Sequence, residues 1–338
     1  MIRTSLSACV ITGESLPENL ELLLTSALKY PFHTGMTTDA PPQSGRLLHL
    51  GLLRFTGPDS SSFLQGQLSN DTRRLAEAGC LFAAYSSPQG RVLALMHLLP
   101  HSSGIIAILP RGLLLPTMQG LRKFVLRAKV KIEDTGELLS VAGAHGADRL
   151  GSAGLAAPKT GTGYTEHEDI GVASVHRDPS RYWVIGTAAR LAERGLAGDV
   201  LRAERVENDW RRADIHAGLP QIYLATREAF VAQMLNLDLL DGISFSKGCY
   251  TGQEIIARTQ NLGRIKRRLY RLQLPHGDWS IGQTLRLTDG RTGRLTEVIQ
   301  NSSGFEALAV LNVQASVDGD AVADAAVAAT SLPLPYEL

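Results

Sequence analysis

The stretch SFSKGCYTGQEIIARTQ, residues 244–260, places a cysteine shortly before a helix start signal. Thr251 and Glu254 have the spacing of a capping box, in which the hydroxyl and the carboxylate accept hydrogen bonds from free N–H groups at the helix start. The pattern therefore predicts a helix over 252–260, with the positive end of its dipole towards the residues that precede it.

Cys249 lies just before this predicted helix, and Lys247 lies two residues earlier. The helix dipole and the lysine charge would both favour a thiolate, the form of cysteine that acts as a nucleophile or a metal ligand. Free cysteines are also commonly buried as small apolar residues. The spacing alone is compatible with a reactive thiol and with an inert one.

The size and charge of the chain limit its possible functions. At 338 residues it exceeds one ordinary hydrophobic core, which favours two or three domains. The 34 lysine and arginine residues nearly cancel the 33 aspartate and glutamate residues, so any site for a polyanion must be local. Nowhere does the sequence run to about 18 apolar residues, and no membrane span is expected.

The three cysteines, Cys9, Cys80 and Cys249, contain no CxxC pair. Neither a zinc knuckle nor a self-sufficient iron–sulfur cage can be built from such a set, so no metal site is expected. Scattered cysteines are typical of a reducing compartment rather than of a disulfide framework. We therefore expect a cytoplasmic protein.

Hydrophobic patterning predicts an α+β protein with antiparallel sheets. Short apolar runs between residues 47 and 110 are separated by SSPQG and HSSG, which are hairpin-type breaks, and Asp289-Gly290 is the strongest hairpin signal further on. The expected segments are an N-terminal helix and linker over 1–45, mixed parts over 46–140 and 141–262, and a small β-barrel with a surface tail over 263–338.

The eight residues KGCYTGQE, 247–254, resemble the K-G-C-Y-x-G-Q-E signature of YgfZ proteins, which are folate-binding relatives of the glycine-cleavage T-protein aminomethyltransferase. Further family-like motifs follow the same order along the chain: FLQGQLSND (63–71), SPQGR (87–91), AGLPQI (217–222) and GISF (242–245). The resemblance covers roughly residues 46–315. It leaves the N-terminal segment outside.

This resemblance implies a T-protein-like fold, with two folate-binding-fold subdomains over 46–140 and 141–262 and a C-terminal β-barrel around a central channel. It implies an accessory protein in the assembly or repair of iron–sulfur enzymes, including enzymes that modify tRNA. Tetrahydrofolate or a one-carbon derivative would be the cofactor. The expected partners are iron–sulfur enzymes or assembly factors, with tRNA involved only indirectly, no membrane, and a monomeric state.

On the same resemblance, Cys249 acts as a transient thiolate and Lys247 tunes it electrostatically. The candidate cofactor-binding residues are Gln65, Asp71, Arg91, Tyr250, Glu254 and Arg258. Polar loop residues of this kind are also common turn formers, and the sequence leaves that alternative open.

The chain departs from the T-protein pattern in two places. Leu93 and Ala94 stand where T-proteins carry two aspartates, and a leucine can neither orient an amine nor stabilise a cation. Classical aminomethyl transfer is therefore not expected, although a one-carbon transferase remains the first alternative. His216 stands where T-proteins carry a pterin-recognising glutamate, with Asp214 as a possible substitute.

A basic run follows the predicted helix, without an acidic residue between Glu254 and Asp278. It consists of Arg258, Arg264, Lys266, Arg267, Arg268 and Arg271. The run could bind the polyglutamate tail of a folate, or it could be an ordinary solvated strand face. An RNA-binding module is a further alternative, but Tyr270 is the only aromatic residue there to stack on a base. The last alternative is a purely structural scaffold in which Cys249 is inert.

Overall fold

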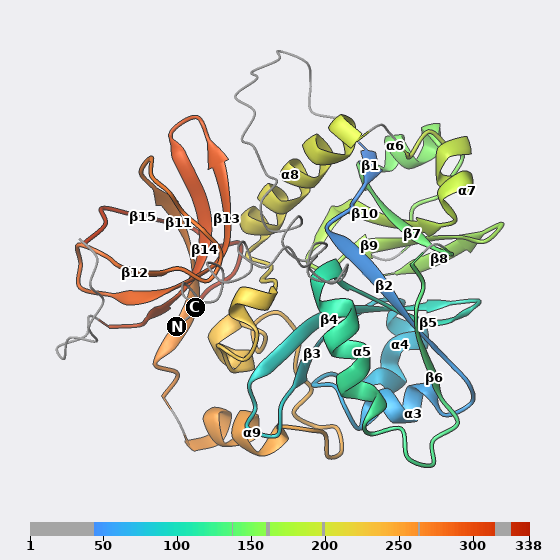
Figure 1. The fold of residues 1–338 in the computed structure, drawn as a ribbon, viewed down its shortest axis with the longest axis horizontal. Coiled ribbons are helices and arrows are strands. Elements are labelled where there is room, and N and C mark those ends of the chain that lie inside the picture. Colours follow the sequence, from blue (N-terminus) through green and yellow to red (C-terminus); the bar gives the residue numbers. More distant parts are fainter. Residues whose placement is uncertain (1–43, 137, 160–162, 198–199, 263, 315–325) are drawn as a thin grey trace, which may run out of the picture. The chain divides into compact units, whose positions relative to one another are not determined.

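The computed structural model describes residues 44–136, 138–159, 163–197, 200–262, 264–314 and 326–338 (Figure 1). The predicted N-terminal helix and Cys9 lie outside these residues. Within them, the chain forms three five-stranded sheets whose neighbouring strands are antiparallel, together with short helices. The predicted α+β class with antiparallel sheets is therefore confirmed.

The first sheet in the chain has the order β3-β4-β5-β2-β6. Its strands are β2 Leu50–Thr56, β3 Leu81–Ser86, β4 Val92–His101, β5 Gly104–Pro110 and β6 Lys131–Asp134. The SSPQG and HSSG breaks fall at the β3–β4 and β4–β5 connections, as predicted. β3 and β4 are buried almost throughout, because their near-continuous apolar runs are covered on both faces of the sheet.

The second sheet has the order β1-β7-β10-β9-β8. Its strands are β1 Ser44–Arg46, β7 Ser140–His145, β8 Tyr164–His167, β9 Ile170–Val175 and β10 Asp178–Gly186. The helices of the described chain are α3 Ser60–Gln65, α4 Leu75–Ala78, α5 Leu114–Arg122, α6 Ala147–Ser152, α7 Ala188–Glu193, α8 Val200–Ala217 and α9 Gln253–Leu262. Single 3-10 turns stand at η1 Thr72–Arg74, η2 Arg111–Leu113, η3 Leu224–Thr226 and η4 Ala232–Leu235.

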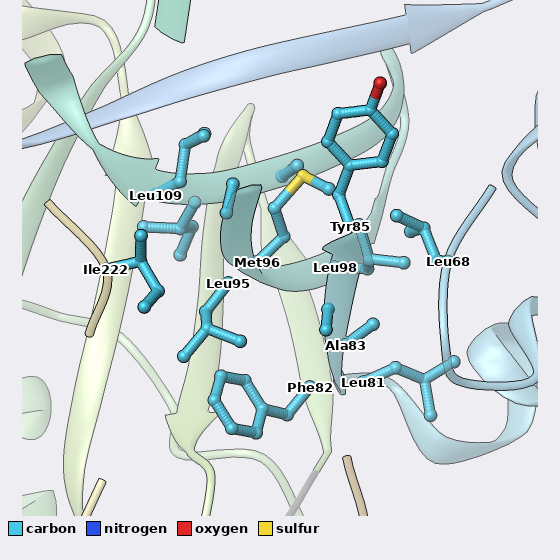
Figure 2. Packing of buried hydrophobic residues seen from close by; sticks show 14 of the residues in the cluster. Leu68, Leu81, Phe82, Ala83, Tyr85, Leu95, Met96, Leu98, Leu109 and Ile222 are labelled. Atoms are coloured by element: carbon cyan, nitrogen blue, oxygen red, sulfur yellow. The ribbon is translucent and has the colours of Figure 1, made fainter. Parts of the chain in front are cut away.

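The main core lies on both faces of β3 and β4. Figure 2 shows Phe82 and Leu95 on one side of these strands and Tyr85 and Met96 on the other, which is the alternation expected of strands. The Phe82 side meets the second sheet, where His97 of β4 stacks on Phe82 at 4.5 Å and lies 4.4 Å from the ring of Trp183. This contact makes one continuous core from the first two sheets.

The third sheet, of order β12-β13-β14-β11-β15, corrects the prediction of a β-barrel. Its strands are β11 Arg267–Leu274, β12 Thr284–Arg286, β13 Thr292–Asn301, β14 Gly304–Asn312 and β15 Thr330–Leu332. In the described residues its edge strands, β12 and β15, are only three residues long and do not pair with each other. One isolated bridge, between Leu287 and Val327, is the pairing seen between these two edges in the described residues. A single bridge does not close the sheet into a barrel.

The C-terminal residues also differ from the predicted surface tail. β15 pairs with β11, and the Tyr336 hydroxyl donates to the Gly218 carbonyl oxygen at 2.8 Å. Burial raises the pKa of Tyr336 to about 12. Leu332, Leu334 and Tyr336 are each partly buried and alternate with exposed residues, so the period-two pattern of a strand was present in the sequence.

A buried carboxylate on β13 joins the third sheet to α8. The register of β13 against β14 shifts between Leu295 and Glu297, as in a β-bulge, which can re-aim a side chain. Glu297 is 2% exposed and accepts hydrogen bonds of 2.5 Å from Arg211 of α8 and from the Tyr223 hydroxyl. Burial and the Glu297 charge together raise the pKa of Tyr223, which therefore stays a hydroxyl donor.

Candidate functional site

The ammonium group of Lys247 points into the protein. Its Nζ donates hydrogen bonds to the carbonyl oxygens of Gln65, Leu68 and Asn70, at 2.7, 2.8 and 2.8 Å. The residue is only 5% exposed, and burial lowers its pKa to about 8, partly offset by the Asp71 carboxylate. At neutral pH Lys247 keeps its third proton, so each N–H has one carbonyl acceptor.

The turn that receives this lysine, residues 65–71, is itself held by side-chain hydrogen bonds; we call it the anchor turn. The Gln65 amide oxygen accepts from the backbone N–H and the hydroxyl of Thr72, at 2.8 and 2.9 Å. The Asn70 amide donates to the Phe82 and Asp241 carbonyls. The motif FLQGQLSND therefore builds a fixed set of three carbonyl oxygens that match one ammonium group.

Asp71 ends the anchor turn as the N-cap of η1. Its carboxylate accepts from Arg73 Nε at 2.9 Å and from Arg73 Nη2 at 2.6 Å, and the hydrogen bonds from this side chain lower the pKa of Asp71 to about 2. Both Gln65 and Asp71 are thus engaged within the protein. The turn-forming interpretation of these two residues is the one that the contacts support.

Cys249, in contrast to Lys247, is exposed. The intervening Gly248 has open space around the position where a Cβ would stand. Tyr250 turns inward again: it is 8% exposed, and its ring centroid lies 4.9 Å from Lys247 Nζ. The loop 244–252, here called the cysteine loop, is therefore fixed by two inward side chains and displays the thiol between them.

The start of α9 corrects the predicted capping box. The helix begins at Gln253, and Gly252 before it has φ +83°, a conformation that favours glycine. A Cβ on Gly252 would stand 2.6 Å from the Ser87 carbonyl oxygen and 3.1 Å from the Cα of Gly90. Close approach of the SPQGR loop therefore decides where the helix starts, and the Thr251 hydroxyl instead donates to Gln67 at 3.4 Å.

Comparison with known proteins agrees with this geometry. The chain is 32% identical over 305 residues to the tRNA-modifying protein YgfZ of Pectobacterium carotovorum, which covers 85% of this chain and 89% of that protein. It is 31% identical over 318 residues to the protein of the same name from Edwardsiella ictaluri, which covers 88% and 95%. The chain belongs to the YgfZ family. No protein-family model matches it.

The fold comparison extends the relation beyond the YgfZ family. The glycine cleavage system aminomethyltransferase T of Bartonella henselae superposes with a TM-score of 0.53 over 81% of this chain and 79% of that chain. At 15% identity this likeness shows the fold alone. The predicted T-protein-like fold is thereby confirmed, with an open third sheet in place of the barrel.

The remaining predicted cofactor residues of this YgfZ-family protein lie around the cysteine loop without converging on one point. Arg91 follows Gly90 and donates from Nη1 to the Ala229 carbonyl at 3.0 Å. Glu254 and Arg258 are exposed on α9. The structure brings Lys247, Tyr250, Gln65 and Asp71 together around the anchor turn and leaves these three at its margin.

The basic run is divided between engaged and exposed side chains. Arg268 forms hydrogen-bonded ion pairs of 2.6 and 2.9 Å with Asp238, and Arg271 pairs with Glu306 at 3.0 Å. Arg267 donates to the Asn312 side chain. Arg258, Arg264 and Lys266 are exposed. Arg268 and Arg271 therefore hold the third sheet, and binding of a polyglutamate tail by the exposed members stays a prediction.

His216, at the position of the pterin-recognising glutamate of T-proteins, and Asp214, its proposed substitute, are also engaged. His216 Nε2 lies 2.7 Å from Glu306, and Asp214 pairs with the buried Arg181 at 2.8 Å. Burial raises the pKa of Asp214. Leu93 and Ala94, at the positions of the T-protein aspartates, are 7% and 0% exposed within β4.

Fifteen buried side-chain atoms in the described residues have no hydrogen-bond partner, and two of them belong to Gln221 and Arg227, which the sequence did not single out. The side-chain oxygen of Gln221 and the Nε of Arg227 are buried and have no hydrogen-bond partner in the protein. Gln221 belongs to the AGLPQI motif, which is the signal that could have identified it. Buried polar groups are rarely left unpaired, so these two are candidates to contact a ligand.

The described residues show a small cavity, no metal-binding cluster and no membrane-spanning helix. The cavity lined by Asn70, Arg74, Cys80, His176 and Asp241 has a volume of about 50 Å³, which is far below the roughly 300 Å³ at which ligand pockets begin. No cluster of three or more histidine, cysteine or acidic residues that could hold a metal ion occurs in the part of the chain that the structure describes. No helix among these residues is both long and apolar enough to cross a membrane.

The contrast between Cys249 and Cys80 gives a direct prediction. Cys80 is 4% exposed, and burial raises the pKa of its thiol to about 12. We expect iodoacetamide at pH 7 to alkylate Cys249 at least about tenfold faster than Cys80, because a buried thiol is neither deprotonated nor accessible. Peptide mapping after timed quenching measures both rates, with Cys249→Ser as the control. First labelling of Cys9 or Cys80 would contradict the prediction.

Proposed function

We propose that this YgfZ-family protein is a folate-binding accessory protein in the assembly or repair of iron–sulfur enzymes, including tRNA-modifying ones, and that Cys249 is its reactive thiol. The observation that carries the proposal is the contrast between the buried Lys247 and the exposed Cys249. Three carbonyl hydrogen bonds fix the lysine, and the neighbouring cysteine is thereby presented to solvent. A structural cysteine would instead be buried, as Cys80 is.

The chemistry of the site follows from its residues. A thiolate is a soft ligand and a nucleophile, so an exposed Cys249 can bind an iron atom of a client's cluster transiently. Lys247 acts as the residue that positions the cysteine loop, because its protons are committed to the anchor turn. The buried apolar positions Leu93 and Ala94 support a role without aminomethyl transfer.

Gln221 and Arg227 are the residues proposed to hold the folate. The pterin ring carries N–H donors suited to the Gln221 side-chain oxygen, and its carbonyl and the glutamate carboxylates suit the guanidinium of Arg227. When bound, a reduced folate would supply one-carbon or redox chemistry. The two unpaired polar atoms fit such a ligand, because each offers the complement of a group that folate carries.

The two described cysteines are both free thiols, which supports a reducing compartment. We therefore propose that the protein works in the cytoplasm as a monomer. Its partners would be iron–sulfur enzymes or their assembly factors, and tRNA would be affected through those enzymes.

Isothermal titration with tetrahydrofolate and with its 5-formyl derivative tests folate binding. We expect a 1:1 complex, and we expect Gln221→Leu to weaken it about tenfold, which corresponds to about 1.4 kcal/mol for one buried hydrogen bond. Gln260→Leu, at an exposed position on α9, is the matched control and should bind as the unmodified protein does. If the protein binds neither tetrahydrofolate nor the 5-formyl derivative, the folate part of the proposal is wrong.

A further inference from the structure

A basic segment that the site does not use follows α5. Residues 122–131, RKFVLRAKVK, contain five lysine and arginine residues and no acidic residue. In a chain whose charges nearly cancel overall, this is a strong local concentration of positive charge. We call this segment the basic strip.

The basic strip is fixed in place, and its apolar residues are divided between two directions. Val125, Ala128 and Val130 are partly buried against the main core. Phe124 and Leu126 face solvent and are 43% and 87% exposed. The packed residues anchor the backbone of the strip to the core, and this anchored backbone carries the exposed Phe124 and Leu126.

Further contacts hold the backbone of the strip. Arg122 Nη2 donates to the Ile132 carbonyl at 2.7 Å, and the Lys129 N–H donates to the Asp59 carboxylate at 2.6 Å. The Phe124 N–H donates to the Leu121 carbonyl at 3.0 Å, which continues the end of α5. These contacts fix the backbone of the strip, which reduces the backbone entropy lost when a partner binds.

The positive charges at the centre of the strip are not neutralised within the protein. Lys131 pairs with Glu133 at 2.7 Å. Lys123, Arg127 and Lys129 are exposed and form no ion pair with any residue in the described ranges. Three cations without an ion-pair partner thus flank Phe124 and Leu126 in the sequence, and apolar side chains next to charged ones are the composition of an interface with an apolar centre and a polar rim.

The geometry points to the basic strip as a docking surface for an acidic partner protein with an apolar centre. Within the proposed function, on which this inference rests, the partner would be the client iron–sulfur enzyme or an assembly factor. Aromatic and arginine side chains dominate binding energy at protein interfaces, and an exposed apolar pair within a polar rim is typical of such sites. Complementary aspartate and glutamate residues would meet the three free cations.

A protein partner fits the strip better than RNA or a membrane. Leu126 is its most exposed apolar residue and cannot stack on a base, and Phe124 is the single aromatic residue of the strip. Three lysine and arginine residues near an anionic membrane would contribute only about 1 kcal/mol each. A protein surface can use the cations and both apolar side chains together.

Helix α3 connects the strip to the anchor turn. Asp59, which binds the Lys129 N–H, immediately precedes α3, and Gln65 at the end of α3 accepts a hydrogen bond from Lys247. At 1.5 Å per residue, this six-residue helix spans about 9 Å. The strip and the anchor turn are therefore attached to opposite ends of one short helix.

The test uses a labelled 18-residue helical peptide with a leucine face and a glutamate rim, followed by fluorescence anisotropy at 50 mM salt. We expect binding that weakens at higher salt, and about tenfold weaker binding to the variant Lys123→Gln/Arg127→Gln/Lys129→Gln. The variant Phe124→Ser/Leu126→Ser should weaken binding to a similar extent. A matched triple variant at exposed cations elsewhere, Lys159→Gln/Arg205→Gln/Arg286→Gln, should bind as the unmodified protein does.

Bulk tRNA and vesicles with 30% phosphatidylserine serve as competing probes. The inference would be overturned in favour of RNA or lipid if either probe bound more tightly than the peptide and if the strip variants lost that binding. Equal peptide affinity of the unmodified protein and both strip variants would also overturn it. Folate titration of the same variants separates the two proposals, because the strip variants should bind folate normally whether or not they bind the peptide.

Discussion

Replacing Lys247 with methionine is expected to lower the free energy of unfolding by at least about 3 kcal/mol. Methionine fills a similar volume but leaves the carbonyl oxygens of Gln65, Leu68 and Asn70 buried without their donor. Each unsatisfied buried group costs about 1–3 kcal/mol. Urea denaturation at pH 7, followed by circular dichroism, measures the change.

Two control variants separate the hydrogen bonds from other effects. Lys247→Arg keeps the charge, but a planar guanidinium cannot direct three N–H groups to three converging carbonyls as an ammonium does, so an intermediate loss is expected. Cys249→Ala alters an exposed side chain in the same loop and should change stability by less than about 0.5 kcal/mol. Lys247→Met with the stability of the unmodified protein would show that the ammonium does not anchor the loop.

The same variants also report on the site. If Lys247 positions Cys249, Lys247→Met should change the alkylation rate of Cys249 at a urea concentration where the variant is still folded. Cys80 serves as the internal reference for retained folding, since it is buried in the main core. An unchanged rate of Cys249 alkylation would mean that the thiol is presented without help from the lysine.

Replacing Glu297 with alanine is expected to destabilise the protein by about 3 kcal/mol or more. The substitution leaves Arg211 and the Tyr223 hydroxyl without the carboxylate that both contact at 2.5 Å. Removing one partner of a buried ion pair is costly because the other charge stays desolvated. An arginine guanidinium stays protonated in proteins, so the variant leaves a buried positive charge without its carboxylate partner.

A double-mutant cycle distinguishes this ion pair from the general loss of a side chain. Tyr223→Phe removes one hydrogen bond and should cost about 1 kcal/mol, while Arg211→Met in the Glu297→Ala background should recover part of the loss. Thermal and urea denaturation of the unmodified protein, Glu297→Ala, Arg211→Met and the double variant provide the cycle. Additive effects of Glu297→Ala and Arg211→Met would contradict a coupled pair. They would mean that apolar packing, and not this ion pair, attaches the third sheet to α8.

Short-range patterns in the sequence were sufficient for much of the fold. The hairpin breaks HSSG and Asp289-Gly290 fall between β4 and β5 and between β12 and β13, because glycine-containing turns restrict which chain reversals are possible. The apolar runs predicted the buried strands β3 and β4. The motif KGCYTGQE indicated the family to which the chain belongs.

Only the tertiary structure determined which distant segments of the chain contact that motif. Lys247 turns inward because a turn about 180 residues earlier supplies three carbonyl oxygens, and no local rule in the cysteine loop encodes those acceptors. The helix starts one residue later than predicted because Gly90 approaches Gly252 from another loop. Local sequence sets backbone preferences, whereas the pairing of buried polar groups depends on which distant segments meet. The sequence by itself therefore determined that a cysteine stands before a helix, and only the packing determined that it faces solvent.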